Sequence, residues 1–170
     1  MKNYTWAPAT GTDVGDIVAL AQTHFETEID EFFNPEPIAY SRNITLAIVN
    51  QFYLPTTELF SVARDSEGHL LAYTWVKGYD KSLWSDENMI SVRMAHVDLN
   101  QSARLRIRLI RDMLEIWEKF AEFSGHDIIC SNTIRRSQDA FLKIHAQHGY
   151  EVRGSFAYKK LSATQATPAN

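Results

Sequence analysis

The most regular pattern of hydrophobic and polar positions lies in the second half of the chain. Its apolar side chains recur at helical spacing at Leu105, Leu109, Met113, Trp117 and Phe120. The run that precedes them, residues 89–97 (MISVRMAHV), is typical of a strand. Gly125 follows the pattern at the place where glycine commonly ends a helix. The sequence therefore predicts a strand that turns directly into a long helix, with the junction between them at residues 97–111.

The first half of the chain predicts one strand followed by two helices. Residues 4–8 form a short apolar run, and the capping residues 10–13 precede an amphipathic helix that runs through His24. Acidic, aromatic and proline residues at positions 26–37 then interrupt the helical pattern and predict a loop. The helical spacing resumes over residues 40–53, so a second helix is expected there.

Three consecutive strands are expected between the second helix and the long helix. Residues 59–64 and 69–77 are rich in residues that favour strands, and the polar residues 65–68 between them suit a hairpin turn. Residues 78–88 are polar and predict a loop, after which residues 89–97 provide the third strand. The pattern thus indicates an antiparallel meander that leads into the long helix.

The end of the chain predicts one more strand, one more helix and a final strand. Residues 127–132 form a short apolar run after a helix, which is typical of a buried strand parallel to the strand before that helix. Ser137 can cap a helix over residues 138–148, and residues 150–161 suggest the last strand. We expect a single domain over residues 1–161 and a polar tail over residues 162–170.

Composition and charge narrow the class of protein. The chain has 170 residues, of which 45% are hydrophobic and 22% are charged, as in ordinary globular domains. A formal net charge of -4 argues against nucleic acid or an anionic membrane as a partner. The single cysteine, Cys130, excludes an internal disulfide and is expected to be a buried thiol in a reducing compartment. With no apolar segment near the ~20 residues of a membrane span, we expect a soluble, cytoplasmic protein.

The order of these elements resembles the GNAT superfamily of acyl-CoA-dependent N-acetyltransferases over residues 4–161. Three segments support the resemblance. They are the hairpin FSVARDSEGHLLAYTWV, the junction VDLNQSARLRIRLIR and the closing segment FLKIHAQHGYEV. The resemblance implies an α/β (α+β) fold, in which a mixed and mostly antiparallel central sheet has helices on both of its faces.

The resemblance also implies a binding site for acetyl-CoA, and no metal. In the family, the pantetheine arm enters between the fourth and fifth strands, and the pyrophosphate rests on backbone amides at the start of the long helix. The corresponding residues here are Val97, Leu99, Gln101, Ser102, Ala103, Arg104 and Arg106. The family places glycines within this motif, but no alignment of the motif on this sequence puts a glycine there.

Two interpretations of the arginines at this junction remain open. In the first, guanidinium groups replace the glycine loop, since their planar donors suit phosphate oxygens. In the second, Arg108 pairs with Asp112 and Arg111 pairs with Glu115, at a spacing that stabilises an exposed helix.

Catalysis in the family needs an acid to protonate the departing thiolate and a base to take a proton from the amine. The position of the family's tyrosine acid is occupied here by His145, and Tyr150 offers a phenol nearby. A hydrogen-bonded core histidine is the alternative role of His145. For the base, His96 near the end of its strand and Asp98 just beyond it are the best placed.

The acidic, aromatic loop lies in the region that covers the acceptor site in this fold. Glu28, Glu31 and Phe33 are therefore candidate substrate-binding residues, and carboxylates there would attract a cationic amine. The function expected is transfer of an acetyl group to a primary amine, of a small molecule or a protein, by direct attack. The alternative is a GNAT-fold protein without catalytic activity, which serves as a structural component of a larger assembly such as a viral particle, or of a homo-oligomer.

Overall fold

The computed structural model describes residues 3–28, 33–82, 85–135 and 138–154. In this part of the chain, five strands form one sheet in the order β1-β2-β3-β4-β5. The strands are β1 (Tyr4–Pro8), β2 (Glu58–Asp65), β3 (Leu70–Lys81), β4 (Asn88–Val97) and β5 (Ile128–Ser131). β1 to β4 pair antiparallel, whereas β5 pairs parallel to β4. The meander and the parallel fifth strand predicted from the sequence are thus confirmed.

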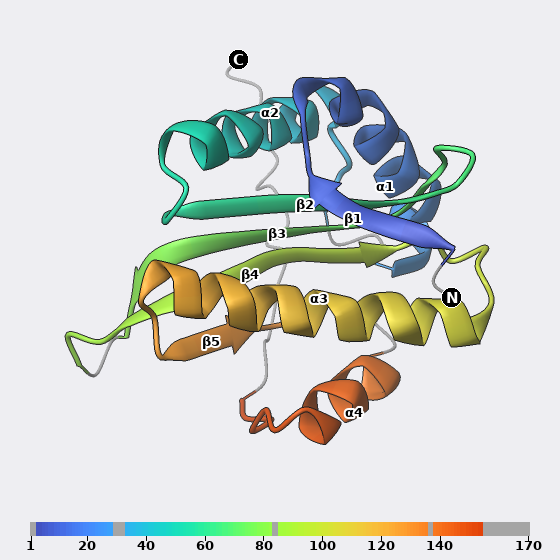
Figure 1. The fold of residues 1–170 in the computed structure, drawn as a ribbon. Helices are drawn as coiled ribbons and strands as arrows, with labels where there is room; N and C mark the ends of the chain where they lie inside the picture. Colours follow the sequence, from blue (N-terminus) through green and yellow to red (C-terminus); the bar gives the residue numbers. More distant parts are fainter. Residues whose placement is uncertain (1–2, 29–32, 83–84, 136–137, 155–170) are drawn as a thin grey trace, which may run out of the picture.

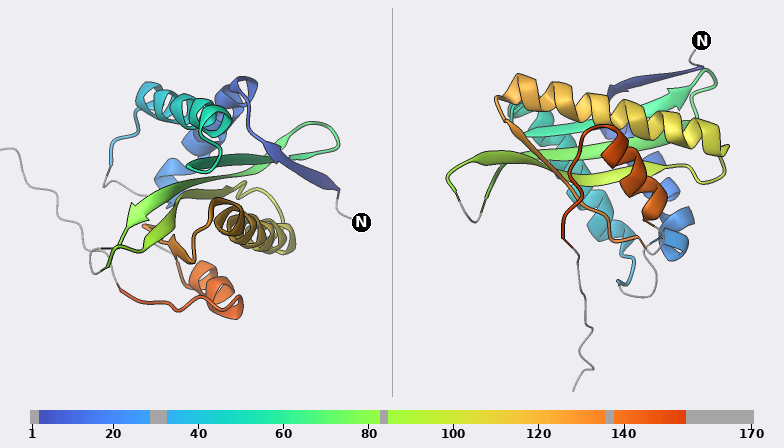
Figure 2. Two further views of the ribbon diagram at one scale, coloured as in Figure 1. Left: turned by 60° about the vertical axis from the view of Figure 1, so that its left-hand side comes forward. Right: turned by 90° about the horizontal axis from the view of Figure 1, so that it is seen from below.

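Four helices cover the two faces of this sheet (Figures 1 and 2). They are α1 (Val14–Glu28), α2 (Pro37–Tyr53), α3 (Ala103–Ser124) and α4 (Asp139–Gln147). α1 and α2 lie on one face, while α3 and α4 lie on the other. The mixed, mostly antiparallel sheet with helices on both faces is the fold class that the sequence predicts. Among the described residues, no helix combines the length and apolar character needed to cross a membrane.

Each helical layer has its own buried core, because side chains alternate between the two faces along every strand. The core between the sheet and α3 includes Leu109, Met113 and Trp117, all fully buried. The core on the other face includes Ile17 from α1 and Ile44 from α2. The sheet is therefore covered on both faces, and side chains at its strand ends can reach either layer.

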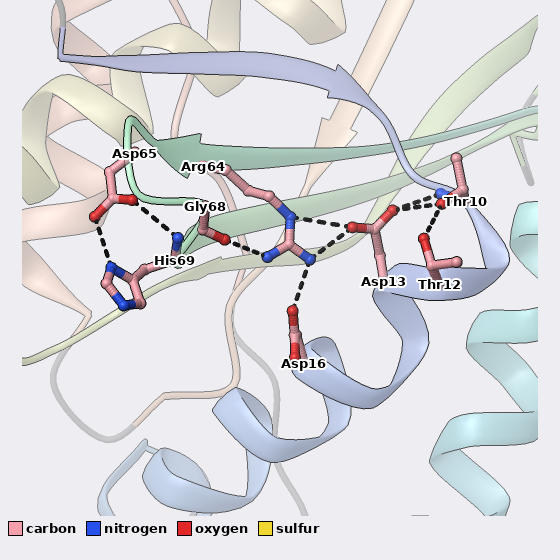
Figure 3. Close-up of polar contacts among 8 residues, drawn as sticks. All are labelled: Thr10, Thr12, Asp13, Asp16, Arg64, Asp65, Gly68 and His69. Carbon is pink, nitrogen blue, oxygen red and sulfur yellow. Dashed lines mark hydrogen bonds and ion pairs between the residues drawn. The ribbon is translucent and has the colours of Figure 1, made fainter.

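A cluster of polar contacts fixes the start of α1 to the β2–β3 hairpin (Figure 3). The carboxylate of Asp13 accepts hydrogen bonds from the Thr10 amide at 2.7 Å and from Arg64 Nη2 at 2.6 Å. Arg64 also donates to Asp16 at 2.8 Å and to the carbonyl of Gly68 at 2.7 Å. One guanidinium group thus joins the turn of the hairpin to the first turn of α1.

The structure moves several of the predicted boundaries. α1 extends to Glu28, and α2 begins at Pro37, where proline suits the first turn because no amide hydrogen bond is lost there. β3 continues to Lys81, so the loop predicted from residue 78 is shorter. The reason is a bulge at residues 78–79, where Tyr79 has a φ of 61° and breaks the alternating pattern.

Two expectations about the end of the chain are wrong. Cys130 is exposed, not buried, because β5 pairs with β4 on one side only within the described residues. Residues 150–154 do not form a strand, and the remainder of the predicted last strand lies outside the described residues. Ser137, the predicted cap of α4, and the polar tail also lie outside them, and the helix begins at Asp139 after Gln138.

Candidate functional site

β4 and β5 separate at the strand-to-helix junction that the sequence singles out. They pair only where residues 89–92 of β4 face residues 128–131 of β5. Beyond Val92, a register shift between β3 and β4 adds a residue to β4, and the strand continues to Val97 without β5 beside it. The gap between the two strands is thus built into the sheet, where backbone groups of β4 are left for other partners.

A cavity of about 420 Å³ opens on the α1 and α2 side of this gap. Its walls come from α1, from the segment before α2, from the end of β4 and from residues 132–135 after β5. Aromatic rings dominate the lining, and they belong to Phe25, Phe33, Tyr40, Tyr73 and Phe141. This volume lies within the usual range for sites that bind small molecules.

His96 lies on the wall of this cavity and contacts a second buried histidine. The two rings are stacked, with His24 Nδ1 3.2 Å from His96 Nε2. His24 Nε2 is in turn 3.6 Å from Asp98 Oδ1. His24 comes from α1, 72 residues before His96, so three separate segments bring these ionisable groups together. Only 4% of His24 and 5% of His96 is exposed.

The His96 ring also packs against a tyrosine, which is in turn hydrogen-bonded to a second tyrosine. Tyr73, the residue opposite His96 on β3, stacks on it with ring centroids 5.1 Å apart. The hydroxyl of Tyr73 is 2.8 Å from that of Tyr40 on α2. Burial raises the pKa of Tyr40 to about 12, so its phenol is neutral at pH 7. His96 is therefore fixed between α1 and β3.

Asp98 organises the turn that joins β4 to α3. Its carboxylate accepts from the amide of Asn100 at 3.0 Å and from the side chain of Gln101 at 2.8 Å. Ser102 then caps α3 by accepting from the amide of Leu105. Asp98 thus contacts both the start of α3 and the histidine pair.

The predicted acyl-CoA residues lie along this turn and the first turn of α3. Val97 is buried under α3, Leu99 is in the turn, and Ala103 is the first residue of the helix. The amides of the first helical residues point out of the helix end, where the helix itself offers no acceptor. Arg104 is exposed.

Arg106 supplies an unused donor at this helix end. Its Nε is buried and has no hydrogen-bond partner in the described part of the chain. A buried guanidinium nitrogen without an acceptor is costly, and a phosphate oxygen would satisfy it. The residues present therefore fit a pyrophosphate through helix amides and an arginine side chain, without the glycines of the family. Asp112 is buried and accepts from Tyr4 and Trp6, so its carboxylate faces inward.

The two candidate acids lie on a second cavity of about 260 Å³, which shares residues 132–135 with the first. His145 Nδ1 is 2.9 Å from the carbonyl of Phe141, and Nε2 is 3.0 Å from Ser131 Oγ. Since the carbonyl can only accept, Nδ1 carries the proton, and burial lowers the pKa of His145. The Tyr150 hydroxyl is buried without a hydrogen-bond partner among the described residues, and burial raises its pKa.

Arg135 lies between the two cavities. Its Nη2 donates to the carbonyl of Ala95 at 2.5 Å, on the edge of β4 that β5 leaves uncovered. The guanidinium group also lies 5.7 Å from the centre of the Phe141 ring. The sequence offered no signal for this contact, because Arg135 follows β5 in an irregular segment.

The predicted substrate-binding residues are only partly described. Phe33 is part of the cavity lining, as is Glu36 at the start of α2. Glu28 is the last residue of α1, and the position of its side chain is not described. Glu31 lies outside the described residues. His24 also belongs to the site, and its place on the apolar face of α1 is the signal for it in the sequence.

No family model matches the chain, and the comparison with curated proteins found no match either. Solved structures do match. A predicted acetyltransferase from Clostridium acetobutylicum, solved with acetyl-CoA, is 11% identical with a TM-score of 0.68, covering 92% of this chain and 96% of that one. AAC(6')-Iy, in complex with the bisubstrate analogue CoA-S-monomethyl-acetylneamine, is 13% identical with a TM-score of 0.66, covering 94% and 100%.

A third similar structure is glucosamine-6-phosphate N-acetyltransferase from Arabidopsis thaliana. It is 11% identical with a TM-score of 0.64, and the match covers 95% of this chain and 100% of that one. At such low identity these likenesses concern the fold. The chain therefore has the acyl-CoA N-acyltransferase fold, and the resemblance to the GNAT superfamily is confirmed at that level.

Proposed function

We propose that this protein is an N-acetyltransferase that moves an acetyl group from acetyl-CoA to a primary amine. The observation that carries the proposal is the pair of adjoining cavities where β4 and β5 separate, with His96 on one wall and Tyr150 on another. Solved acetyltransferases of the same fold support it, since one contains acetyl-CoA and another a CoA bisubstrate analogue.

Acetyl-CoA would be held at the junction of β4 and α3. The amides of Ala103 and Arg104 and the guanidinium of Arg106, whose Nε is buried and unused among the described residues, offer donors to its pyrophosphate. The edge of β4 that β5 leaves uncovered offers backbone groups to its pantetheine amides, apart from the Ala95 carbonyl that Arg135 occupies. When bound, acetyl-CoA supplies the activated acetyl thioester.

His96 is the proposed base for the acceptor amine. It lies on the larger cavity, whose described lining includes aromatic rings and the carboxylate of Glu36 as well as Arg93 and Arg135. An ammonium group is attracted by a carboxylate and by aromatic faces, and it must lose a proton before its nitrogen can attack. Glu28 and Glu31 remain predictions for the same role in amine binding.

Tyr150 is the proposed acid that protonates the sulfur leaving group. Its hydroxyl has no hydrogen-bond partner among the described residues, and its raised pKa keeps it protonated at pH 7. His145 has hydrogen-bond partners at both ring nitrogens, and its ring packs edge-on against that of Tyr150 at 5.0 Å. We assign to His145 the role of holding the phenol in place.

Binding of acetyl-CoA tests the proposal, with Arg106 as the probe. Titration calorimetry should detect binding to the natural protein, and Arg106→Met should weaken it by about 10- to 100-fold, because a charged hydrogen bond contributes ~1.5–3 kcal/mol. Arg111→Met is the matched control, since Arg111 is exposed further along the same helix. Its affinity should remain close to that of the natural protein.

Two results would contradict this account. Absence of heat and of a thermal shift at millimolar acetyl-CoA would reject the enzyme, because a ligand that binds the folded state must stabilise it. Such a result would favour the alternative, a GNAT-fold protein without catalytic activity that serves in a larger assembly. Equal losses of affinity in both arginine variants would reject the specific role of Arg106.

A further inference from the structure

We propose that His24 is a positioning residue that, together with Asp98, determines which nitrogen of His96 accepts the proton. The inference rests on the proposed function, in which His96 is the base. His24 lies beside both groups: its Nδ1 is within hydrogen-bond distance of His96 Nε2 at 3.2 Å, and its Nε2 is within ion-pair distance of Asp98 Oδ1 at 3.6 Å. The three side chains thus form a chain from the α3 turn to the cavity wall.

Asp98 determines the direction of proton sharing along this row of three side chains. Hydrogen bonds from the Asn100 amide and the Gln101 side chain hold its carboxylate in place. A carboxylate near one nitrogen of an imidazole favours the proton on that nitrogen, here His24 Nε2. His24 Nδ1 then carries a lone pair, so the proton shared between the two histidines belongs to His96 Nε2.

The consequence is a defined base nitrogen on His96. With Nε2 protonated and donating to His24, the lone pair of His96 is on Nδ1, which accepts the proton from the amine. The positive charge then formed on His96 is stabilised through His24 by Asp98. Among the polar groups beside the pair are the phenols of Tyr73, which stacks on His96, and of Tyr40, whose raised pKa of about 12 keeps it neutral at pH 7. Asp98 is the carboxylate that lies beside His24, while Glu36, Arg93 and Arg135 line the cavity that His96 faces.

Burial supports a functional origin for the cluster. Two histidines that are each at least 95% buried cost folding free energy, and apolar residues would pack at the same place without that cost. Buried polar residues that lower the stability of the fold are typical of functional sites. The position of His96 on the wall of the larger cavity agrees with that interpretation.

Kinetics of variants provide the first test. His24→Gln should lower kcat for acetyl transfer by about 10- to 100-fold with little change in KM for acetyl-CoA, because the base loses its orientation while the donor site is intact. His126→Gln is the matched control, since His126 is also buried but lies by Tyr79 at the bulge in β3. Turnover by the natural protein together with undiminished kcat in His24→Gln would overturn the inference.

The ring nitrogens of His96 provide a test that does not depend on activity. In the natural protein, ¹⁵N spectra should show His96 Nε2 as the protonated nitrogen and Nδ1 as the unprotonated one. Asp98→Asn should remove this preference and give averaged signals. The opposite tautomer in the natural protein would overturn the inference whether or not any amine is acetylated. Absence of turnover with the predicted tautomer would instead reject the proposed function.

A second and independent observation concerns the outer face of α2. On this helix, Ile38, Leu46, Val49, Phe52 and Tyr53 are 45–86% exposed and lie within one stripe, and Leu54 beyond its end is 52% exposed. The opposite face is also apolar, since Ile44, Ala47 and Ile48 pack on the sheet. A helix that is apolar on both faces is normally covered on both. In Figure 1, α2 lies above the strands at the top of the view, so one side of the helix faces away from the sheet.

We propose that this stripe is the contact surface between two copies of the chain. Its exposed side chains present on the order of 700 Å², against ~800 Å² per partner in a standard interface and less in the usual surface patch of a monomer. Antiparallel two-fold packing places Leu46 near the axis, because it is at the middle of the stripe. The same symmetry brings Arg42, the one charged residue of α2, towards Phe52 or Tyr53 of the other copy, where a cation over a ring is favourable.

The mass of the full chain in solution tests this surface. Light scattering at micromolar concentration should give twice the 19.5 kDa of one chain. Leu46→Glu should raise the dissociation constant by about 100-fold or more, because two carboxylates would meet near the axis. Phe123→Glu, at a 65% exposed apolar position on α3, should stay dimeric. A natural protein that is monomeric throughout, or a dimer that Leu46→Glu does not weaken, would overturn the proposal.

Discussion

His145 illustrates how surroundings set the protonation of single residues in this protein. The carbonyl of Phe141 keeps its proton on Nδ1, Ser131 faces its other nitrogen, and burial lowers its pKa from 6.5. The residue is therefore neutral at pH 7 in the folded state. Because the folded pKa is below the unfolded value, the unfolded chain binds more protons at moderately acidic pH.

This shift predicts a pH dependence of stability. The free energy of unfolding should fall as the pH falls below about 6.5, and the fall should continue until the pH reaches the folded pKa of His145. His145→Gln should reduce the slope of stability against pH in this window, measured by urea unfolding. His69→Gln is the control, because the side chain of His69 is 69% exposed. A slope unchanged in His145→Gln would contradict the assignment of a buried neutral ring.

At the scale of elements, capping residues and ion pairs help to determine where the helices begin and end. Arg64 joins the hairpin to the start of α1 through Asp13 and Asp16 (Figure 3). Burial alone would raise the pKa of Asp13, but the Thr10 amide and the Arg64 guanidinium outweigh it and lower that pKa. Asp13 thus stabilises the fold above the unfolded pKa near 3.8, and this contribution is lost as the pH falls through the folded value.

Removal of the ion pairs that Arg64 forms with Asp13 and Asp16 should lower the free energy of unfolding measurably. Arg64→Met should destabilise the protein by about 1–2 kcal/mol at pH 7, because it leaves the buried Asp13 carboxylate without its cation, while partial exposure of Arg64 limits the loss. The deficit should shrink at about pH 3, where Asp13 is increasingly protonated in both proteins. Urea unfolding at the two pH values measures it, and an equal deficit at both would contradict the ion-pair account.

The end of α3 allows a matched comparison of two glycines. Gly125 caps the helix with a φ of 72°, whereas Gly15 lies inside α1 without a positive φ, and an added Cβ would meet nothing within 4 Å at either position. Gly125→Ala should cost about 1 kcal/mol, because the left-handed conformation strains any side chain. Gly15→Ala should instead stabilise by about 0.5–1 kcal/mol. Thermal unfolding would refute the account if both changes had the same sign.

At the scale of the whole molecule, the sequence predicts contacts that are local and misses those that are not. The β4–α3 junction, the β2–β3 hairpin and the left-handed cap at Gly125 follow from short patterns, and the structure confirms them. His24 and Arg135 reach the site from distant segments, so no periodicity could place them there. Cys130 shows the converse, since an apolar run does not reveal that its strand is paired on one side only.

The sequence pattern is an incomplete guide at the β4–α3 junction as well. A missing glycine motif suggests loss of the cofactor site when the motif is considered alone. In the folded chain, Arg106 Nε is buried without a hydrogen-bond partner among the described residues, and it lies one turn from the start of α3, which is why we propose a pyrophosphate site there. Whether a phosphate can bind depends on the direction in which the hydrogen-bond donors point. That direction is determined by side-chain packing, which a short sequence motif does not reveal.

Release of free thiol from acetyl-CoA in the presence of primary amines distinguishes an N-acetyltransferase from a protein that shares only the fold. The natural protein should release thiol in step with acetylation of an amine, whereas His96→Gln should be slower by about 10²- to 10⁴-fold, the usual contribution of a general base. Acetyl-CoA binding and thermal stability should be similar in both proteins. Turnover that survives His96→Gln unchanged, or no turnover by the natural protein with any class of primary amine, would contradict the account.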